Sequence, residues 1–112
     1  MIQIVKNNVP EVQDELELAI ARALEAMGLL AEGNVKAHTP VGDTGNLRNS
    51  ITHELGHHEV YIGTNIEYAP YVEYGHRTPS GGFVDPRHFM RDGIMNNLET
   101  YAKIAEQALR GF

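Results

Sequence analysis

The sequence contains no cysteine, so it offers neither a disulfide framework nor a thiol nucleophile. It also has no apolar run approaching the roughly 20 residues that a membrane-spanning helix requires. Residues 1–6 are too short and too polar to form the apolar region of a signal peptide. We therefore expect a soluble protein that is made in the cytosol and has no membrane partner.

Positive charge is scarce, because 9 Lys and Arg residues face 15 Asp and Glu residues, which leaves a net charge of −6. This balance argues against sequence-specific nucleic-acid binding as the main activity. The charge is also uneven: residues 1–35 carry six acids against two bases, and residues 76–91 carry three arginines against one aspartate. Two solvated surfaces are the commoner interpretation of such a pattern; attraction between the unlike ends of different copies is the alternative.

The 112 residues are enough for one domain, 1–112, with a modest core, and the sequence shows no internal repeats. Apolar residues recur three and four positions apart, which predicts an amphipathic helix from about Pro10 to Ala37. Asn7–Asn8 supply its cap, and a short strand over residues 2–5 precedes it. Two glycines, Gly28 and Gly33, either weaken this helix or allow close packing against it.

The middle of the chain predicts a short helical turn followed by a hairpin. Thr39–Pro40 ends the long helix, since the residue before a proline avoids the α region. A helical turn at residues 45–49 follows, anchored by Leu47 and Ile51. Alternating residues from about 51 to 64 then predict a β-hairpin. A continued helix is the alternative, but the clear strand pattern after residue 59 favours the hairpin.

The last third predicts two more helices and a loop. Asn65 caps a short helix over residues 66–73, which Gly75 ends. Residues 76–84 are rich in Gly, Pro and Ser, and we expect them to form a flexible loop that becomes ordered only against a partner. Asp85–Pro86 then opens a C-terminal helix. The expected fold is α+β, in which the long N-terminal helix and the C-terminal helix pack on a small antiparallel sheet.

One string in the hairpin, HELGH at His53–His57, matches the signature of zinc peptidases. That signature works on a helix, where both histidines face one zinc ion and the glutamate acts as general base. On a strand, positions i and i+4 lie about 13 Å apart, too far to share a metal. The strand pattern thus argues against a zinc site, and a small zinc hydrolase using His53, Glu54 and His57 is kept only as the alternative function. We expect His53, His57 and His58 to be exposed residues at the hairpin tip.

Five motifs in one order give the chain a resemblance to a known family. They are Pro40–Gly45, Leu47–Ile51, Gly63–Asn65, Tyr68–Gly75 and Pro86–Arg91. This series resembles the tail-component, or tail-completion, proteins of long-tailed bacteriophages and prophages, which act at the head–tail junction. The chain departs from the family pattern in two places: Gly42 is inserted before the aspartate, and two residues separate Pro86 from the phenylalanine.

The resemblance implies a non-enzymatic virion structural protein that needs no cofactor and no metal. Its partners would be other tail or connector proteins and further copies of itself in a tail-end ring. It would be present in the host cytoplasm during assembly and then in the tail or neck of the virion. We predict that the contacts combine an acidic helix start with a basic and aromatic region. The residues concerned are Glu11, Glu15, Tyr71, Tyr74, Arg77, Phe83 and Arg87.

Overall fold

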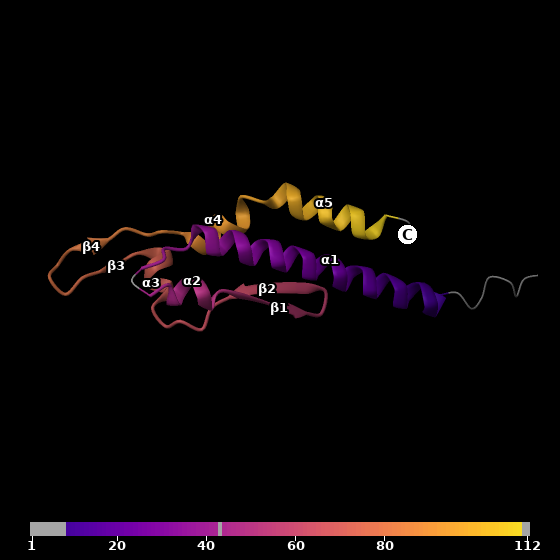
Figure 1. Ribbon diagram of the computed structural model, residues 1–112, viewed down its shortest axis with the longest axis horizontal. Coiled ribbons are helices and arrows are strands. Elements are labelled where there is room, and N and C mark those ends of the chain that lie inside the picture. Colours follow the sequence, from indigo (N-terminus) through magenta and orange to yellow (C-terminus); the bar gives the residue numbers. More distant parts are fainter. Residues whose placement is uncertain (1–8, 43, 111–112) are drawn as a thin grey trace, which may run out of the picture.

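The computed structural model describes residues 9–42 and 44–110, so the strand expected at 2–5 and the cap expected at 7–8 lie outside the described residues. The chain forms five helices and two hairpins within this part (Figure 1). In chain order the elements are α1 (Val9–His38), α2 (Asn46–Ser50), β1 (Thr52–Gly56), β2 (Glu59–Gly63), α3 (Ala69–Tyr74), β3 (His76–Arg77), β4 (Phe83–Val84), α4 (Phe89–Met95) and α5 (Leu98–Leu109). The α+β prediction is confirmed.

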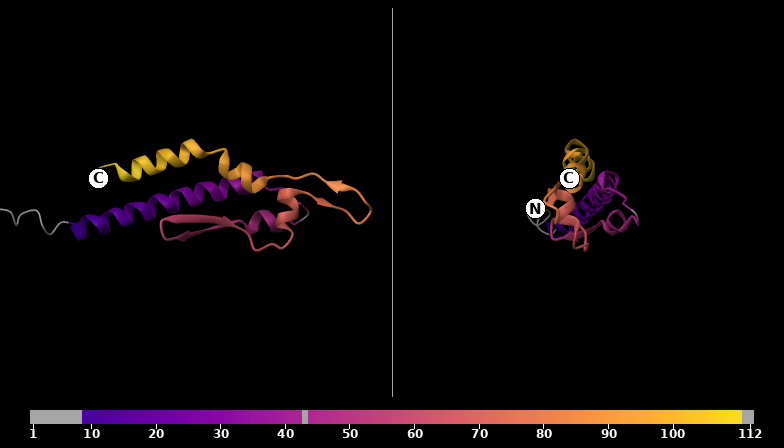
Figure 2. Two further views of the ribbon diagram at one scale, coloured as in Figure 1. Left: turned by 180° about the vertical axis from the view of Figure 1, so that it is seen from behind. Right: turned by 90° about the vertical axis from the view of Figure 1, so that its left-hand side faces the viewer.

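Helix α1 forms the axis of an elongated molecule. The β1–β2 hairpin runs along one side of it, and α4 and α5 run along another (Figures 1 and 2). Its bounds agree with the prediction to within one residue at each end. The buried Thr39 hydroxyl donates to the Val35 carbonyl at the end of the helix, and Pro40 follows. Nowhere in residues 9–42 and 44–110 does a helix have the length and apolar character needed to cross a bilayer.

The β1–β2 hairpin forms where the alternating pattern predicts it. The strands are antiparallel, and His53 pairs with Ile62 while Leu55 pairs with Val60. These pairs share the face turned toward α1, because side chains alternate along a strand. Gly28 permits the close approach: a Cβ there would lie 2.6 Å from the His53 ring and 2.9 Å from Val60. Gly33, in contrast, has open space around it.

The hydrophobic core sits where α1, α2, α3 and α4 meet. Its buried members come from four segments that are far apart in sequence: Val35, Leu47, Ile51, Ala69 and Phe89. Leu47 and Ile51 are buried as predicted. Many large apolar side chains remain exposed, including all four tyrosines from 61 to 74, so core packing does not account for these tyrosines.

The C-terminal helix differs from the prediction. Asp85–Pro86 does not open it; α4 begins at Phe89, and Asn96–Asn97 separates it from α5. The backbone N–H groups of Arg87 and His88 donate to the carbonyl groups of Val72 and Glu73, at 2.8 and 3.2 Å. These long-range bonds hold residues 85–88 against α3, which delays the start of the helix.

Two further predictions for this region need correction. The short helix begins at Ala69 rather than at 66, and Pro70 lies in its first turn, where the missing N–H has no cost. Residues 76–84 are not an irregular loop throughout, because His76 pairs with Val84 and Arg77 pairs with Phe83 in a second small hairpin. The predicted end of α3 at Gly75 is confirmed, with φ at 78°.

Candidate partner interface

Five of the predicted interface residues gather at one end of the molecule. This end patch consists of Tyr71, Tyr74, Arg77, Phe83 and Arg87. Its aromatic members are 58%, 71% and 59% exposed, in chain order, and both arginines are exposed. Exposed aromatic and arginine side chains are the residue types that dominate the energy of protein interfaces.

Backbone geometry joins the segments of the end patch. Arg77 and Phe83 are cross-strand partners in the β3–β4 hairpin. The Phe83 ring lies over Gly75, where a Cβ would come within 2.9 Å of it. The Tyr71 ring meets the His76 ring edge to face, with 5.7 Å between their centroids. The end patch is therefore carried by connected segments rather than by separate loops.

A buried carboxylate fixes the end patch to the core. Glu73 is 7% exposed, and its two oxygens accept hydrogen bonds from the backbone N–H groups of Met90 and Arg91, at 2.9 and 3.0 Å. These N–H groups belong to the first turn of α4, which otherwise lacks acceptors and carries a partial positive charge. Glu73 therefore ties α3 to α4, although the residue precedes α4 by sixteen positions in the chain.

The acidic start of α1, Glu11 and Glu15, lies at the opposite end of the molecule. Both side chains are exposed. Figure 1 shows the first turns of α1 at one extreme and the β3–β4 hairpin at the other. The structure therefore separates the predicted acidic and basic surfaces, which cannot meet within one copy.

His53 is not an exposed tip residue, contrary to the prediction. Its side chain is 13% exposed, and its imidazole lies between two carboxylates of α1. Nε2 lies 3.0 Å from Glu25 Oε1 and Nδ1 lies 3.1 Å from Glu32 Oε1. Hydrogen bonds to these carboxylates raise the pKa of His53, and the bond to His53 lowers the pKa of Glu32. The contacts of His53 with Glu25 and Glu32 hold the hairpin on α1.

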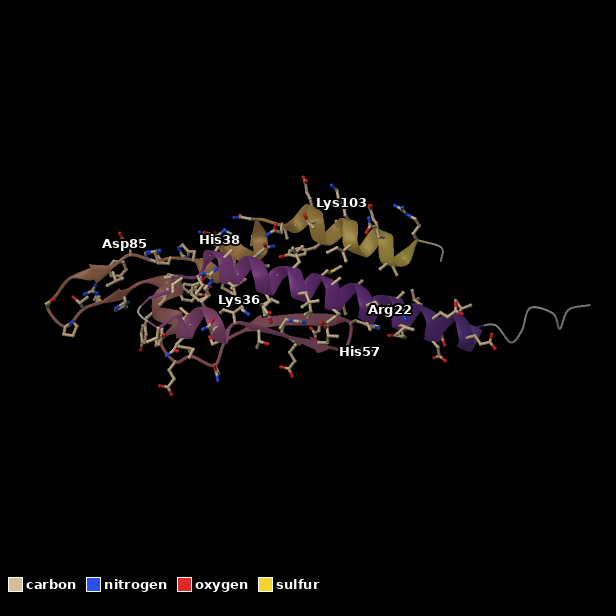
Figure 3. All side chains as sticks on the ribbon, viewed as in Figure 1. Arg22, Lys36, His38, His57, Asp85 and Lys103 are labelled. Carbon is tan, nitrogen blue, oxygen red and sulfur yellow. The ribbon has the colours of Figure 1, made fainter. Side chains whose placement is uncertain are left out.

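The tip histidines of the hairpin are exposed as predicted. His57 and His58 occupy the two-residue turn, with ring centroids 4.0 Å apart. His58 Nε2 lies 2.7 Å from Glu17 Oε2, which gives the hairpin a second link to α1. Figure 3 shows His57 at the tip beside the N-terminal half of α1.

The HELGH string lacks the geometry of a zinc peptidase. His53 lies on a strand and faces α1, Glu54 lies on the opposite face, and His57 lies in the turn. The acids that bind His53 come from α1, not from the string. Across residues 9–42 and 44–110, no group of three His, Asp or Glu side chains is arranged to hold a metal ion. The contacts of His53 with α1 instead dock the hairpin on the helix.

The sequence pointed to the residues of the end patch as an interface, which stays a prediction, but not to the residues that position them. No local pattern in the sequence links Glu73 to Met90, which lies 17 positions later in the chain. For His53 a signal exists: Glu25 and Glu32 are seven residues apart, which places them two turns apart on one face of α1, on either side of Gly28.

Both matches to known proteins are to phage or prophage proteins. The family model described as "Bacteriophage HK97-gp10, putative tail-component" matches residues 5–75. The chain is also 37% identical over 68 residues to the Mu-like prophage FluMu G protein 2 of Haemophilus influenzae. That match covers 59% of this chain and 49% of the relative, so the chain spans about half the length of the relative. No solved structure matches it.

Proposed function

Because this chain belongs to the HK97-gp10-like family of bacteriophage tail components, we propose that it is a non-enzymatic structural protein that completes the tail and joins it to the head. The likeness to a Mu-like prophage protein supports a phage or prophage origin. In this role the protein contacts other tail or connector proteins and further copies of itself. It is present in the host cytoplasm during assembly and afterwards in the virion.

The observation that carries this proposal is the separation of unlike surfaces along the molecule. The acidic start of α1 lies at one end and the end patch lies at the other. A contact between unlike surfaces repeats from copy to copy, and it closes into a ring when the rotation between copies permits. The end patch thus supports a head-to-tail ring at the end of the tail.

The physical chemistry of the end patch supports protein contact rather than catalysis. Its aromatic side chains supply large apolar areas that desolvate on binding. The arginines give direction, because exposed ion pairs contribute only about 0–1 kcal/mol each. Affinity thus rests mainly on the aromatic residues and orientation on the charges. The net charge of −6 keeps isolated copies apart until a tail or connector presents a template.

Purified tails from the phage that encodes this chain test the proposal. Mass spectrometry should find the protein in stoichiometric amounts, and antibody labelling in electron micrographs should place it at the head-proximal end. A strain without the gene should accumulate heads and tails that do not join. Joined infectious particles in that strain, or labelling along the whole tail, would contradict the proposed position.

A further inference from the structure

The free edge of β2 borders an apolar hollow. Within the described part of the chain, β2 pairs with β1 on one side only. Beside it is a hollow of about 230 Å³ between the hairpin, α1 and the C-terminal helices. This β2 hollow is lined by Met27, Ala31, Val60, Ile62, Ile94 and Tyr101. An unpaired strand edge next to apolar side chains is a surface on which a further strand can be added.

A strand that fills the β2 hollow needs apolar residues two positions apart, because alternate side chains of a strand lie on one face. Val60 and Ile62 both face α1 and are partly exposed. A strand added to β2 would run about 4.8 Å away, with its own alternate side chains beside those of β2. Isoleucines at i and i+2 would then lie over the hollow.

The start of the sequence supplies this spacing, with Ile2 and Ile4 separated by Gln3. Residues 1–8 belong to the chain but lie outside the described residues. We propose that residues 1–6 of a second copy bind along the free edge of β2 as a third strand, with Ile2 and Ile4 in the β2 hollow.

The reach of the chain assigns the strand to a second copy. Gly28 lies against Val60, and from Val9 to Gly28 the helix advances about 28 Å at 1.5 Å per residue. Ile4 precedes Val9 by five positions, which span at most about 18 Å when fully extended. The segment of the same copy therefore cannot place Ile4 in the β2 hollow, whereas the segment of a neighbour has no such limit.

This contact deepens the proposed self-association and rests on it. One short strand binds weakly by itself, because a few backbone bonds and two side chains must offset the ordering of the segment. In a ring each copy gives one strand and receives one, so the effective concentration of the segment is high. Isolated copies are then monomers or weak oligomers, and the strand contact forms when a tail assembles them.

A peptide tests the contact without any tail. The full chain, labelled with ¹⁵N and kept dilute, is titrated with a synthetic peptide of residues 1–8 up to millimolar concentration. We expect amide shifts at Val60, Ile62 and Ile94. A peptide with Ile2→Asp and Ile4→Asp should bind at least about tenfold more weakly, because it loses both apolar contacts.

Two protein variants locate the site. Met27→Glu places a charge in the β2 hollow and should abolish the shifts. Leu29→Glu makes a matched change at a site on α1 that is 56% exposed and should leave them unchanged. Thermal melting of both variants confirms that they remain folded. The peptide comparison stands if Met27→Glu unfolds.

The opposite results overturn the strand contact. Absence of shifts at millimolar peptide, shifts confined to other surfaces such as Ile20 and Leu24, or equal binding of the Asp peptide would each do so. None of these results concerns the position of the protein in the tail, which the analysis of purified tails decides separately.

Discussion

The Glu73 carboxylate accepts a hydrogen bond from the backbone N–H of Met90 at 2.9 Å, and this contact joins α3 to the first turn of α4. A second bond, from the N–H of Arg91, uses the other oxygen. Both N–H groups lie where a helix has donors without intrahelical acceptors. One buried side chain thus supplies the cap that α4 lacks in its own sequence, since His88 at the N-cap makes no side-chain cap bond.

Replacing Glu73 should therefore destabilise the fold, because the first turn of α4 then loses its side-chain cap. We expect Glu73→Ala to lower the free energy of unfolding by about 1–2 kcal/mol, because it leaves two partly buried N–H groups at the start of α4 without their side-chain acceptor. Glu73→Gln should cost less, since one carbonyl oxygen remains. Urea unfolding measures both changes, and Glu67→Gln, at an exposed position, is the matched control. Equal stability of all three variants would show that the cap is not needed.

The close contact of α4 with α1 predicts opposite effects of alanine at two glycines. A Cβ at Gly93 would lie 2.5 Å from Val35 Cα, so Gly93→Ala should force the helices apart and cost about 1–3 kcal/mol. Gly33 has no atom within 4 Å of such a Cβ, so Gly33→Ala should raise stability by up to about 1 kcal/mol. Thermal melting of the two variants measures the contrast. A stable Gly93→Ala variant would contradict the packing of α4.

The link between His53 and α1 predicts a stability maximum in mildly acidic solution. The pKa of His53 is raised above its ordinary 6.5. The stability that protonated His53 gives to the folded state is therefore fully present below pH 6.5 and is lost as the pH rises through the folded pKa. The pKa of Glu32 is lowered below its ordinary 4.5, so its contribution is present above 4.5 and is lost as pH falls through the folded pKa. Together the two groups stabilise the folded protein most between about pH 4.5 and pH 6.5.

Urea unfolding at pH 5.5 and pH 8.5 tests this link. The wild-type protein should be more stable at the lower pH, and His53→Gln should remove most of that difference. His57→Gln, in the exposed turn, should keep it. If His53→Gln retains the wild-type pH dependence, the stabilising proton resides on another group.

Periodicity was sufficient to predict α1 and the β1–β2 hairpin. Both signals are local, because apolar spacing of three and four or of two is written in consecutive residues. Gly45 and Gly75 adopt φ values of 69° and 78°, at a turn and at a helix end, which are places where glycine in a sequence commonly marks a positive φ. The tyrosine, phenylalanine and arginine residues of the end patch fall within residues 71–87, so the sequence could suggest them as an interface, but their exposure is known only from the structure.

The remaining features depend on contacts between distant segments. Pro86 suits a helix start locally, yet hydrogen bonds to α3 keep residues 85–88 out of the helix. The β3–β4 pairing involves only two residues on each strand, too few for a visible alternation. The burial of His53 required knowledge of which face of α1 receives the hairpin. In each case tertiary structure overrides a local preference, and a single sequence does not reveal it.

The most direct test of the account is a charge exchange between the two ends of the molecule. Arg77→Glu with Arg87→Glu should leave the monomer folded and block its incorporation into tails, because the end patch then repels the acidic start of α1. Adding Glu11→Lys and Glu15→Lys to the same chain should restore part of the incorporation, since unlike charges face each other again. The measurement is the fraction of joined infectious particles in a strain that lacks the gene and expresses each variant. The account predicts loss and then partial recovery; normal joining by the doubly reversed arginine variant would contradict it.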